Sequence, residues 1–441
     1  MKLIYDVHER PKFGANLVFA IQQLLAIIAA TILVPLLVSN ATGVKMDQAA
    51  ALFGAGVGTL VYIFFTKGKS PVFLGSSFAF IDPLIGACAY GFCGIILGTV
   101  FAGLVYAVIA LVIHFTGSGW VNKLLPPVII GPTVALIGLS LCGSAINNVN
   151  NTSVGDYNLW AILVGLFSFA ITVLASAKGK RTAKLIPFII GIGAGYALAS
   201  VFTVLSPIVN VPEMNLINFT PFTQLNFSTI FRVPEFTFVN AINEKASLIT
   251  GWGAVADLFV LFAPVAFVVL AEHVADHKNL SSIIEKDLIK EPGLKKTLLG
   301  DGVGSIAGAI FGGCPNTTYG ESVGCVAITG NASVATIFTT AILCLLLSFF
   351  NPFVVFVNTI PVCVIGGICI ALYGFIAVSG LKMIQNVDLN DNRNLFTVSA
   401  ILVVGIGGLT INIGPVTLTN IATALICGIL TKLILGKKKE D

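Results

Sequence analysis

The stretch Leu270–Lys278, which reads LAEHVADHK, places five ionisable side chains at the end of a long apolar run. Glu272 and Asp276 are four residues apart, so on a helix both carboxylates lie on one face, about 6 Å from each other. Two carboxylates this close in an apolar environment cannot both stay ionised cheaply, and such a pair can therefore take up and release a proton. His273 and His277 share a neighbouring face by the same spacing.

These residues predict a proton-coupling group made of Glu272, Asp276 and His277. Lys278 and Asn279 follow His277 at once, an order that also fits a helix end at the membrane interface. A metal site from the two histidines and Asp276 is a further interpretation. It is disfavoured because the order E-H-x-x-D-H differs from the zinc motif H-E-x-x-H and no third cluster of ligands is evident.

A second carboxylate, Glu321, lies in the glycine-rich stretch GGCPNTTYGESVG, which covers Gly312–Gly324. A glycine beside it, Gly320, leaves main-chain N–H groups accessible to a ligand. The carboxylate can accept hydrogen bonds from N–H groups of the same ligand. This combination indicates a site for a flat, neutral molecule that carries N–H donors and C=O acceptors on its edge. Asp301 fits either a structural or a functional role, and no role follows for Asp257.

The composition defines the environment of these residues. Of 441 residues, 56% are hydrophobic and only 10% are charged, whereas soluble domains carry about 25% charged residues. The chain is therefore predicted to be an integral membrane protein. The net charge of +4 gives no sign of nucleic-acid binding, and nine scattered cysteines without a CxxC pair predict neither a metal centre nor a disulfide framework.

Apolar runs long enough to cross a bilayer fill most of the chain. About fourteen segments are predicted, at residues 14–38, 47–66, 71–89, 93–115, 125–145, 159–177, 184–205, 248–277, 297–313, 316–332, 334–350, 353–376, 395–411 and 414–435. Lysine and arginine concentrate in alternate loops, which places both termini in the cytoplasm by the positive-inside rule. The inside group runs from Lys2, Arg10 and Lys12 to Lys437–Lys439, and the outside loops hold only Lys45, Arg232 and Lys245.

The one long polar insertion, Ser206–Lys245, divides these segments into seven and seven. An odd-numbered unit that is duplicated must insert upside down, so two inverted repeats are predicted. The third and tenth segments are each interrupted by proline, glycine and hydroxyl residues, at Ser70–Pro83 and Gly313–Ser322. Interrupted segments at matching positions of inverted repeats indicate a substrate site near the membrane midplane. The alternative is a pair of ordinary re-entrant turns at the interface.

Five motifs resemble the nucleobase–ascorbate transporter family, also called nucleobase:cation symporter family 2, and most closely its bacterial uracil:proton symporters. They are LLAIIAATILVPLL, TKGKSPVFLGSSFAFI, LAEHVADH, EPGLKKTLLGDG and GGCPNTTYGESVGCVAIT. The resemblance runs through nearly the whole chain. Purine-type members have glutamine and asparagine in the last motif, where this chain has Gly320, Glu321 and Ser322.

The resemblance implies an all-α membrane fold of fourteen segments in two inverted repeats of seven, with short strands in the broken third and tenth segments. It also implies a core domain and a gate domain. The first repeat covers 1–205 (core 14–115, gate 125–205), an extracellular loop covers 206–246, and the second repeat covers 247–436 (core 247–350, gate 353–436).

By the same resemblance, the substrate-binding carboxylates are Glu272 and Glu321. Phe78 and Gly320 provide backbone contacts, Tyr319 lies beside them and Tyr373 lies on the gate side. The family's proton-linked position falls on Asp276, one residue before His277. The family often has Gln-His where this chain has Gln22 and Gln23, which removes one titratable group.

The function that follows is proton-coupled import of uracil across the cell membrane by alternating access, with the proton as coupling ion and no other cofactor. Symport of another nucleobase, such as xanthine or urate, is the alternative. An anion exchanger or channel of the same architecture is more distant, because carboxylates at the site would repel an anion. No nucleophile or cofactor motif indicates an enzyme. Membrane lipid surrounds the protein, and the sequence leaves open whether it forms a homodimer.

Overall fold

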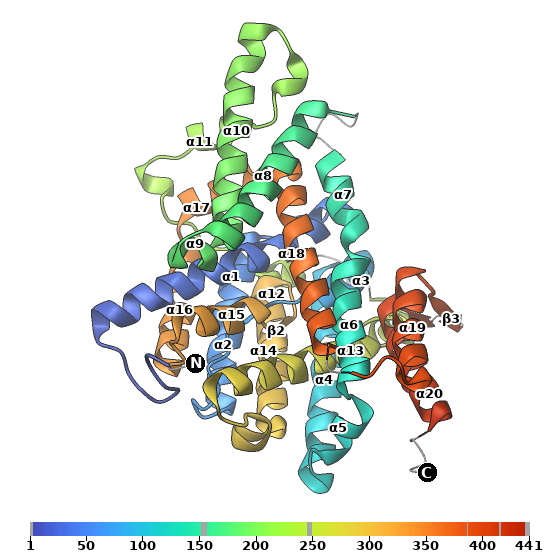
Figure 1. Ribbon diagram of the computed structural model, residues 1–441. Coiled ribbons are helices and arrows are strands. Elements are labelled where there is room, and N and C mark those ends of the chain that lie inside the picture. The colour runs from blue at the N-terminus through green and yellow to red at the C-terminus, as the bar shows by residue number, and fades with distance from the viewer. Residues whose placement is uncertain (1–2, 151–156, 245–248, 386, 414–415, 437–441) are drawn as a thin grey trace.

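The computed structural model describes residues 3–150, 157–244, 249–385, 387–413 and 416–436 (Figure 1). Helices make up most of it, and four short strands form two pairs. The first half contains α1 (Phe13–Thr42), α2 (Gln48–Phe65), β1 (Leu74–Ser76), η1 (Phe78–Phe80), α3 (Ile81–Ala87), η2 (Cys88–Tyr90), α4 (Gly91–Thr116), α5 (Gly119–Leu124), α6 (Pro127–Ser140), α7 (Cys142–Asn150), α8 (Leu159–Lys178), α9 (Arg181–Leu185) and α10 (Pro187–Val209).

A polar connection with four short helices leads to the second half: η3 (Pro212–Met214), α11 (Thr220–Thr223), η4 (Phe227–Thr229) and α12 (Thr237–Asn243). The second half contains α13 (Gly251–Ile284), the kinked turn η5 (Ile289–Gly293), α14 (Leu294–Gly312), β2 (Asn316–Thr318), α15 (Gly320–Thr329), α16 (Val334–Ser348), α17 (Asn351–Asn358), α18 (Val362–Met383), α19 (Asn392–Ile406), β3 (Ile411–Ile413), β4 (Val416–Leu418) and α20 (Asn420–Leu435).

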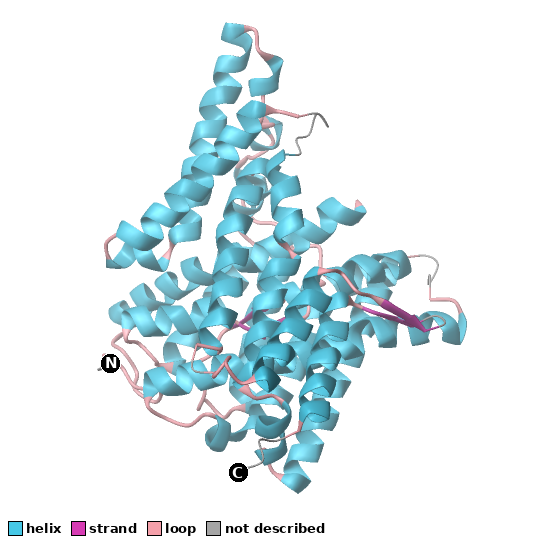
Figure 2. Cartoon of the chain, turned by 45° about the vertical axis from the view of Figure 1, so that its right-hand side comes forward, coloured by secondary structure: helices cyan, strands magenta, loops and turns pink. Residues whose placement is uncertain are grey.

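The predicted helical membrane fold is confirmed. Within the described residues, eight helical stretches are long and apolar enough to cross a membrane, from Phe13–Thr42 to Val362–Met383. One of these stretches, Phe78–Thr116, contains both the third and the fourth predicted segments, and the other five segments correspond to α14, α15 and the shorter apolar helices α16, α19 and α20. The predicted strands are confirmed too, because β1 precedes α3 in the third segment and β2 precedes α15 in the tenth. Figure 2 shows one strand pair inside the helical body and the β3–β4 hairpin at its edge.

Two predicted boundaries are wrong for clear physical reasons. The twelfth segment, predicted at 353–376, divides into α17 and α18, because Pro361 disfavours helical geometry in the residue before it. The eighth segment, predicted to end at 277, continues as α13 to Ile284, about two turns further. The predicted starts at 248 and 414, together with Lys2, Lys245 and Lys437–Lys439, lie outside the described residues.

The helices pack in two groups. In the first group α14 packs against α2 and α4, α13 packs against α4, and α16 packs against α1 and α2. In the second group α18 packs against α6, α7 and α8, while α19 packs against α20 and α6. The first group holds both strand-containing segments. The predicted core and gate domains, as bodies that move against each other, remain a prediction.

The two halves are joined at their centre by the strand pair β1–β2. The strands are antiparallel, with Leu74 opposite Thr318, Gly75 opposite Thr317 and Ser76 opposite Asn316. Close helix packing brings the strands together: a Cβ atom at Gly54 of α2 would lie 2.5 Å from the carbonyl oxygen of Gly308 in α14. Small residues at such a crossing let two helix backbones approach within a membrane.

Candidate functional site

A cavity of about 380 Å³ lies where the two broken segments meet the side of α13. This volume is within the range of small-molecule sites, about 300–1,000 Å³. Six of the eight residues predicted for the site line it: Phe78, Glu272, Asp276, Tyr319, Gly320 and Glu321. The lining also includes Val134 of α6 and Phe375 and Ile376 of α18, so both packing groups contribute walls.

The strand pair positions the start of α15 beside this cavity. Two further backbone hydrogen bonds extend the pairing, from Ser77 N to the oxygen of Pro315 (2.9 Å) and from Tyr319 N to the oxygen of Phe73 (3.3 Å). Helix α15 begins immediately afterwards, at Gly320. The first N–H groups of a helix have no intrahelical acceptor and carry the positive end of its dipole. They therefore provide hydrogen-bond donors beside the carboxylate of Glu321.

The ring of Tyr319 is fixed against the opposite strand. Its hydroxyl donates to the carbonyl oxygen of Ser76 at 2.9 Å, and its ring lies directly over Gly75. A Cβ atom at Gly75 would lie 2.3 Å from two atoms of that ring. Only glycine fits at this strand position, which explains why the third segment carries a glycine beside its hydroxyl residues.

Replacing Gly75 with alanine should therefore displace Tyr319 and break its hydrogen bond to Ser76. Overpacking of a buried contact costs about 1–3 kcal/mol of unfolding free energy, which thermal unfolding in detergent would measure. The matched control is Gly324→Ala in α15, where a Cβ atom meets nothing within 4 Å. That variant should be as stable as the parent or slightly more stable. Equal stabilities for the two variants would contradict the proposed crowding.

The two predicted carboxylates of α13 both face the cavity, but they differ in their partners. Asp276 accepts a hydrogen bond from the hydroxyl of Thr318 at 2.7 Å, through its Oδ2 atom. Within the described residues, Oε2 of Glu272 is buried and has no hydrogen-bond partner. A buried acceptor without a partner costs free energy that a bound donor would recover. Glu272 is thus the group in this cavity that most requires a ligand.

The histidines occupy the other side of α13 and hold the helix in place. His273 Nδ1 lies 2.7 Å from Asp301 Oδ2 in α14, and its Nε2 lies 3.0 Å from the hydroxyl of Thr297. Both His273 and Asp301 are fully buried. The role left open for Asp301 therefore includes a structural one, since it pairs with α13 from the neighbouring helix.

His277 is buried as well, so the interpretation of this residue as a helix end at the interface is wrong. Its Nδ1 donates to the carbonyl oxygen of His273 at 2.8 Å. In a neutral ring, Nε2 is then an acceptor, and the hydroxyl of Tyr62 lies 2.7 Å from it. That hydroxyl also lies 2.8 Å from Ser70 Oγ. The side chain does not line the cavity, and the three residues considered as metal ligands contact separate partners.

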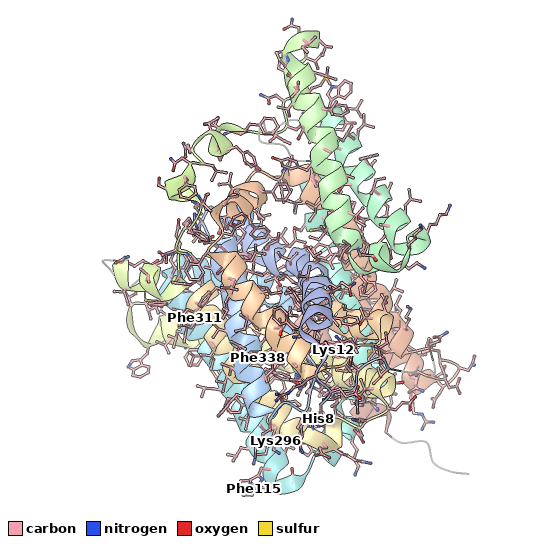
Figure 3. All side chains as sticks on the ribbon, turned by 90° about the vertical axis from the view of Figure 1, so that its left-hand side faces the viewer. His8, Lys12, Phe115, Lys296, Phe311 and Phe338 are labelled. Atoms are coloured by element: carbon pink, nitrogen blue, oxygen red, sulfur yellow. The ribbon has the colours of Figure 1, made fainter. Side chains whose placement is uncertain are left out.

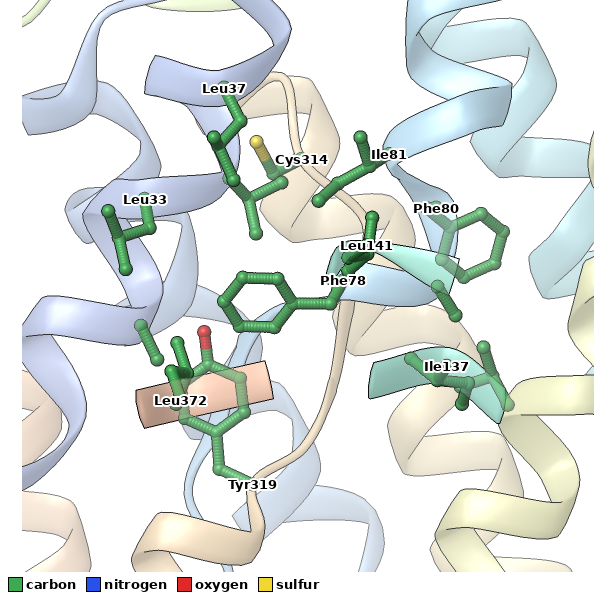
Figure 4. Packing of buried hydrophobic residues seen from close by; sticks show 14 of the residues in the cluster. Leu33, Leu37, Phe78, Phe80, Ile81, Ile137, Leu141, Cys314, Tyr319 and Leu372 are labelled. Carbon is green, nitrogen blue, oxygen red and sulfur yellow. The ribbon is translucent and has the colours of Figure 1, made fainter. Parts of the chain in front are cut away.

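Tyr373, predicted on the gate side, is fully buried and lies behind the cavity wall. Its ring packs edge-on against Phe78, with 5.8 Å between the ring centroids. Figure 4 shows Phe78 and Tyr319 surrounded by Leu33 and Leu37 of α1, Ile137 of α6 and Leu372 of α18. This apolar cluster closes one end of the cavity. The exposed side chains of Asn279 and Lys382 belong to its lining, so the cavity is open on their side.

Several contacts of the site were not predicted. No local sequence pattern indicates the contacts of three hydroxyl groups, those of Thr297, Thr318 and Tyr62, because their partners come from segments remote in the sequence. Gln23 donates to Ser322 Oγ at 2.6 Å and so connects α1 to the first turn of α15. Asp257, to which the sequence assigned no role, accepts a hydrogen bond from the hydroxyl of Tyr90 at 2.8 Å.

A membrane-spanning helical fold with a ligand-sized cavity between two broken segments is the arrangement expected of a secondary transporter. Comparisons with known proteins give the family. The sequence model described as "Permease family" matches residues 14–414. The chain belongs to this family, the nucleobase–ascorbate transporters.

Its relatives are named as permeases, not enzymes, and they match along the full chain. The chain is 37% identical to the uracil permease of Bacillus caldolyticus over 443 residues, covering 100% of this chain and 96% of the relative. The chain is 38% identical to the uracil permease of Bacillus subtilis (strain 168), covering 96% of this chain and 93% of the relative. It is 32% identical to the uracil permease of Escherichia coli (strain K12), covering 97% of this chain and 93% of the relative.

Solved structures show that the fold is shared more widely. The transmembrane domain of a cyanobacterial bicarbonate transporter, BicA, superposes with a TM-score of 0.61 at 14% identity, covering 97% of this chain and 100% of that domain. SLC26A9 superposes with a TM-score of 0.63 at 12% identity, covering 96% of this chain and 66% of that protein. At these identities the likeness concerns the fold alone.

Proposed function

We propose that this protein imports uracil together with protons across the cell membrane, by alternating access. The observation that carries the proposal is the Oε2 atom of Glu272, which is buried without a partner among the described residues, in a cavity that also contains Glu321 and the first turn of α15. Relatives that match the full chain are named uracil permeases, which supports uracil as the substrate.

The chemistry of the cavity complements uracil. The ring offers two N–H donors and two C=O acceptors on its edge. Glu272 and Glu321 supply acceptors for the N–H groups, and the N-terminal N–H groups of α15 at Gly320 supply donors for an oxygen. Phe78 and Tyr319 supply flat apolar surface for the ring. A neutral ligand suits a site whose carboxylates would repel an anion.

The proton is assigned to the Glu272–Asp276 pair, and Glu321 is assigned to holding the base. A charge within a bilayer costs at least ~2.5–3.5 kcal/mol, so a site with three carboxylates favours proton uptake as it closes. His277 is buried behind this pair and hydrogen-bonded to Tyr62, so it does not face the substrate. Any effect of His277 on proton coupling would therefore be transmitted through helix α13. One charge moving through 100 mV supplies ~2.3 kcal/mol, which corresponds to about fiftyfold accumulation of uracil.

Alternating access would move the core domain against the gate domain. The cavity is open beside Lys278 and Lys382, near loops that the positive-inside rule places in the cytoplasm. The opposite end is closed by the contact between Phe78 of the core and Tyr373 of the gate. We assign this arrangement to an inward-open state, in which separation of Phe78 from Tyr373 would open the other side. Both termini are then cytoplasmic.

Uptake of radiolabelled uracil into proteoliposomes tests this proposal. An inwardly directed proton gradient should drive accumulation, and a protonophore should abolish it. Accumulation that the protonophore leaves unchanged would rule out proton coupling. Excess xanthine, urate and bicarbonate should not compete, and competition by bicarbonate would favour anion transport instead.

A further inference from the structure

A second cavity, of about 570 Å³, shares no lining residue with the first one, and Figure 3 labels two of the residues that line it, His8 and Phe338. It is formed by the chain before α1, the end of α2 and the start of α16. His8, Glu9 and Arg10 line it from the first segment, Lys67 and Gly68 from the second, and Val334, Phe338 and Thr339 from the third.

The walls of this cavity are fixed by hydrogen bonds. Residues 4–9 run beside the α15–α16 connection, where Ala332 N donates to the oxygen of Tyr5 (2.9 Å) and Val334 N donates to the oxygen of Val7 (3.0 Å). Asn16 of α1 donates to Thr339 and accepts from Thr336, both at 2.8 Å. A binding surface between these elements is therefore already formed.

Two cations lining the cavity have no acidic partner among the described residues, Arg10 and Lys67. Other lysines on this side are paired: Lys69 contacts Glu291, and Lys286 contacts Asp6 and lowers the pKa of that carboxyl by its hydrogen bond. The acidic residue in the cavity, Glu9, accepts from the backbone N–H of Asp6 at 2.7 Å. The backbone of Lys67 adopts a left-handed φ of 52°, which is uncommon for a residue other than glycine.

Apolar side chains that face outward lie next to these cations. Phe13 of α1 is 84% exposed, Phe64 of α2 is 79% exposed and Phe338 of α16 is 48% exposed. Figure 3 shows Phe338 on the same face as His8 and Lys12, the residue that precedes α1. In a membrane-spanning protein such exposed rings contact lipid, and the cations beside them lie at the level of the headgroups.

We propose that this cavity binds an anionic phospholipid. Arg10 and Lys67 hold the headgroup phosphate, Lys12 adds positive charge at the rim, and an acyl chain lies along Phe338. Arginine and lysine both recognise phosphate oxygens through charge-assisted hydrogen bonds, and basic pockets between membrane helices are suited to lipid headgroups. The ligand is assigned to lipid and not to a free phosphate because the cations and the lipid-facing rings are continuous.

The test measures retention of phosphatidylglycerol by the purified protein, using native mass spectrometry after exchange from vesicles that mix phosphatidylglycerol with phosphatidylcholine. The double variant Arg10→Gln/Lys67→Gln should bind phosphatidylglycerol about thirtyfold more weakly. The matched control is Lys178→Gln/Lys180→Gln, which removes two exposed charges elsewhere and should bind like the parent. Equal affinities of the two double variants would overturn the proposal.

Two further outcomes separate the alternatives. Phe338→Ser keeps both cations, so weaker retention of phosphatidylglycerol by this variant supports a lipid. If Phe338→Ser binds normally and inorganic phosphate displaces the lipid, the site takes a free phosphate and the lipid assignment is wrong. Uracil uptake is measured for each variant in parallel. It checks that the variant is folded without relying on the lipid measurement.

Discussion

Replacing Glu321 with glutamine should abolish measurable uracil uptake. The carboxylate lines the cavity at the first turn of α15, opposite the unpartnered Oε2 atom of Glu272. A hydrogen bond to a charged group contributes about 1.5–3 kcal/mol, so its loss should weaken uracil binding by roughly tenfold to more than a hundredfold. The amide group of the introduced glutamine also carries N–H donors. These would face the N–H donors of uracil, and two donors form no hydrogen bond. Isothermal titration with uracil and uptake into proteoliposomes measure the two effects.

The control for this variant is Glu213→Gln, which changes an exposed glutamate in the connection between the two halves. Its binding and uptake should equal those of the parent. The thermal unfolding of Glu321→Gln should also remain close to the parent, because the change keeps the size of the side chain. Near-normal uptake by Glu321→Gln would refute the binding role assigned to this residue.

Replacing Asp301 with alanine should destabilise the protein by about 1–3 kcal/mol, because it leaves Nδ1 of the buried His273 ring without a partner, while Nε2 keeps its contact with Thr297. The pair connects α14 to α13 on the side opposite the cavity, so transport should fall together with stability. Unfolding free energies in detergent measure the first effect. The control is Asp287→Ala, which removes an exposed pair with Lys290 at 3.5 Å and should cost at most about 1 kcal/mol.

A double variant separates pairing from packing. When His273→Leu is added to Asp301→Ala, no buried polar group remains unpaired between the two helices. The double variant should therefore be more stable than Asp301→Ala alone, since removing both partners costs less than removing one. If the double variant is less stable by the sum of the two single effects, the contact between His273 and Asp301 contributes no pairing energy.

Composition and breaker residues predicted the fold well. Proline and glycine in Gly313–Ser322 cannot continue a regular helix, and the structure has a strand and a new helix start there. The end of α13 was missed because the polar residues after His277 are typical of a water-exposed loop. In the structure the helix continues for two more turns. The buried polar side chains that precede this extension, His273 and His277, bond to Asp301 and Tyr62. These partners come from distant segments and are not visible locally.

Prediction of the site from local sequence patterns meets the same limit. Spacing alone placed Glu272 and Asp276 on one face, and the motif placed Glu321 with them in one cavity. Spacing also placed His273 and His277 together, but it could not tell which face of α13 points to the cavity. That depends on Asp301 and Thr297, which α14 brings from a separate part of the chain. Tyr373 was predicted to face the substrate, yet its ring packs behind Phe78.

The pairing of β1 with β2 has a consequence for how the protein is made. The paired strands are about 240 residues apart, so at about 5–20 residues per second the ribosome needs roughly ten to fifty seconds between them. During this interval β1 would leave unpaired backbone groups inside the bilayer. Thr59 of α2 already satisfies part of this need, since its hydroxyl bonds to both the N–H (3.0 Å) and the carbonyl oxygen (3.2 Å) of Leu74. The first half thus supplies a partner of its own for Leu74 before the second half is translated, and this partner remains in the complete fold.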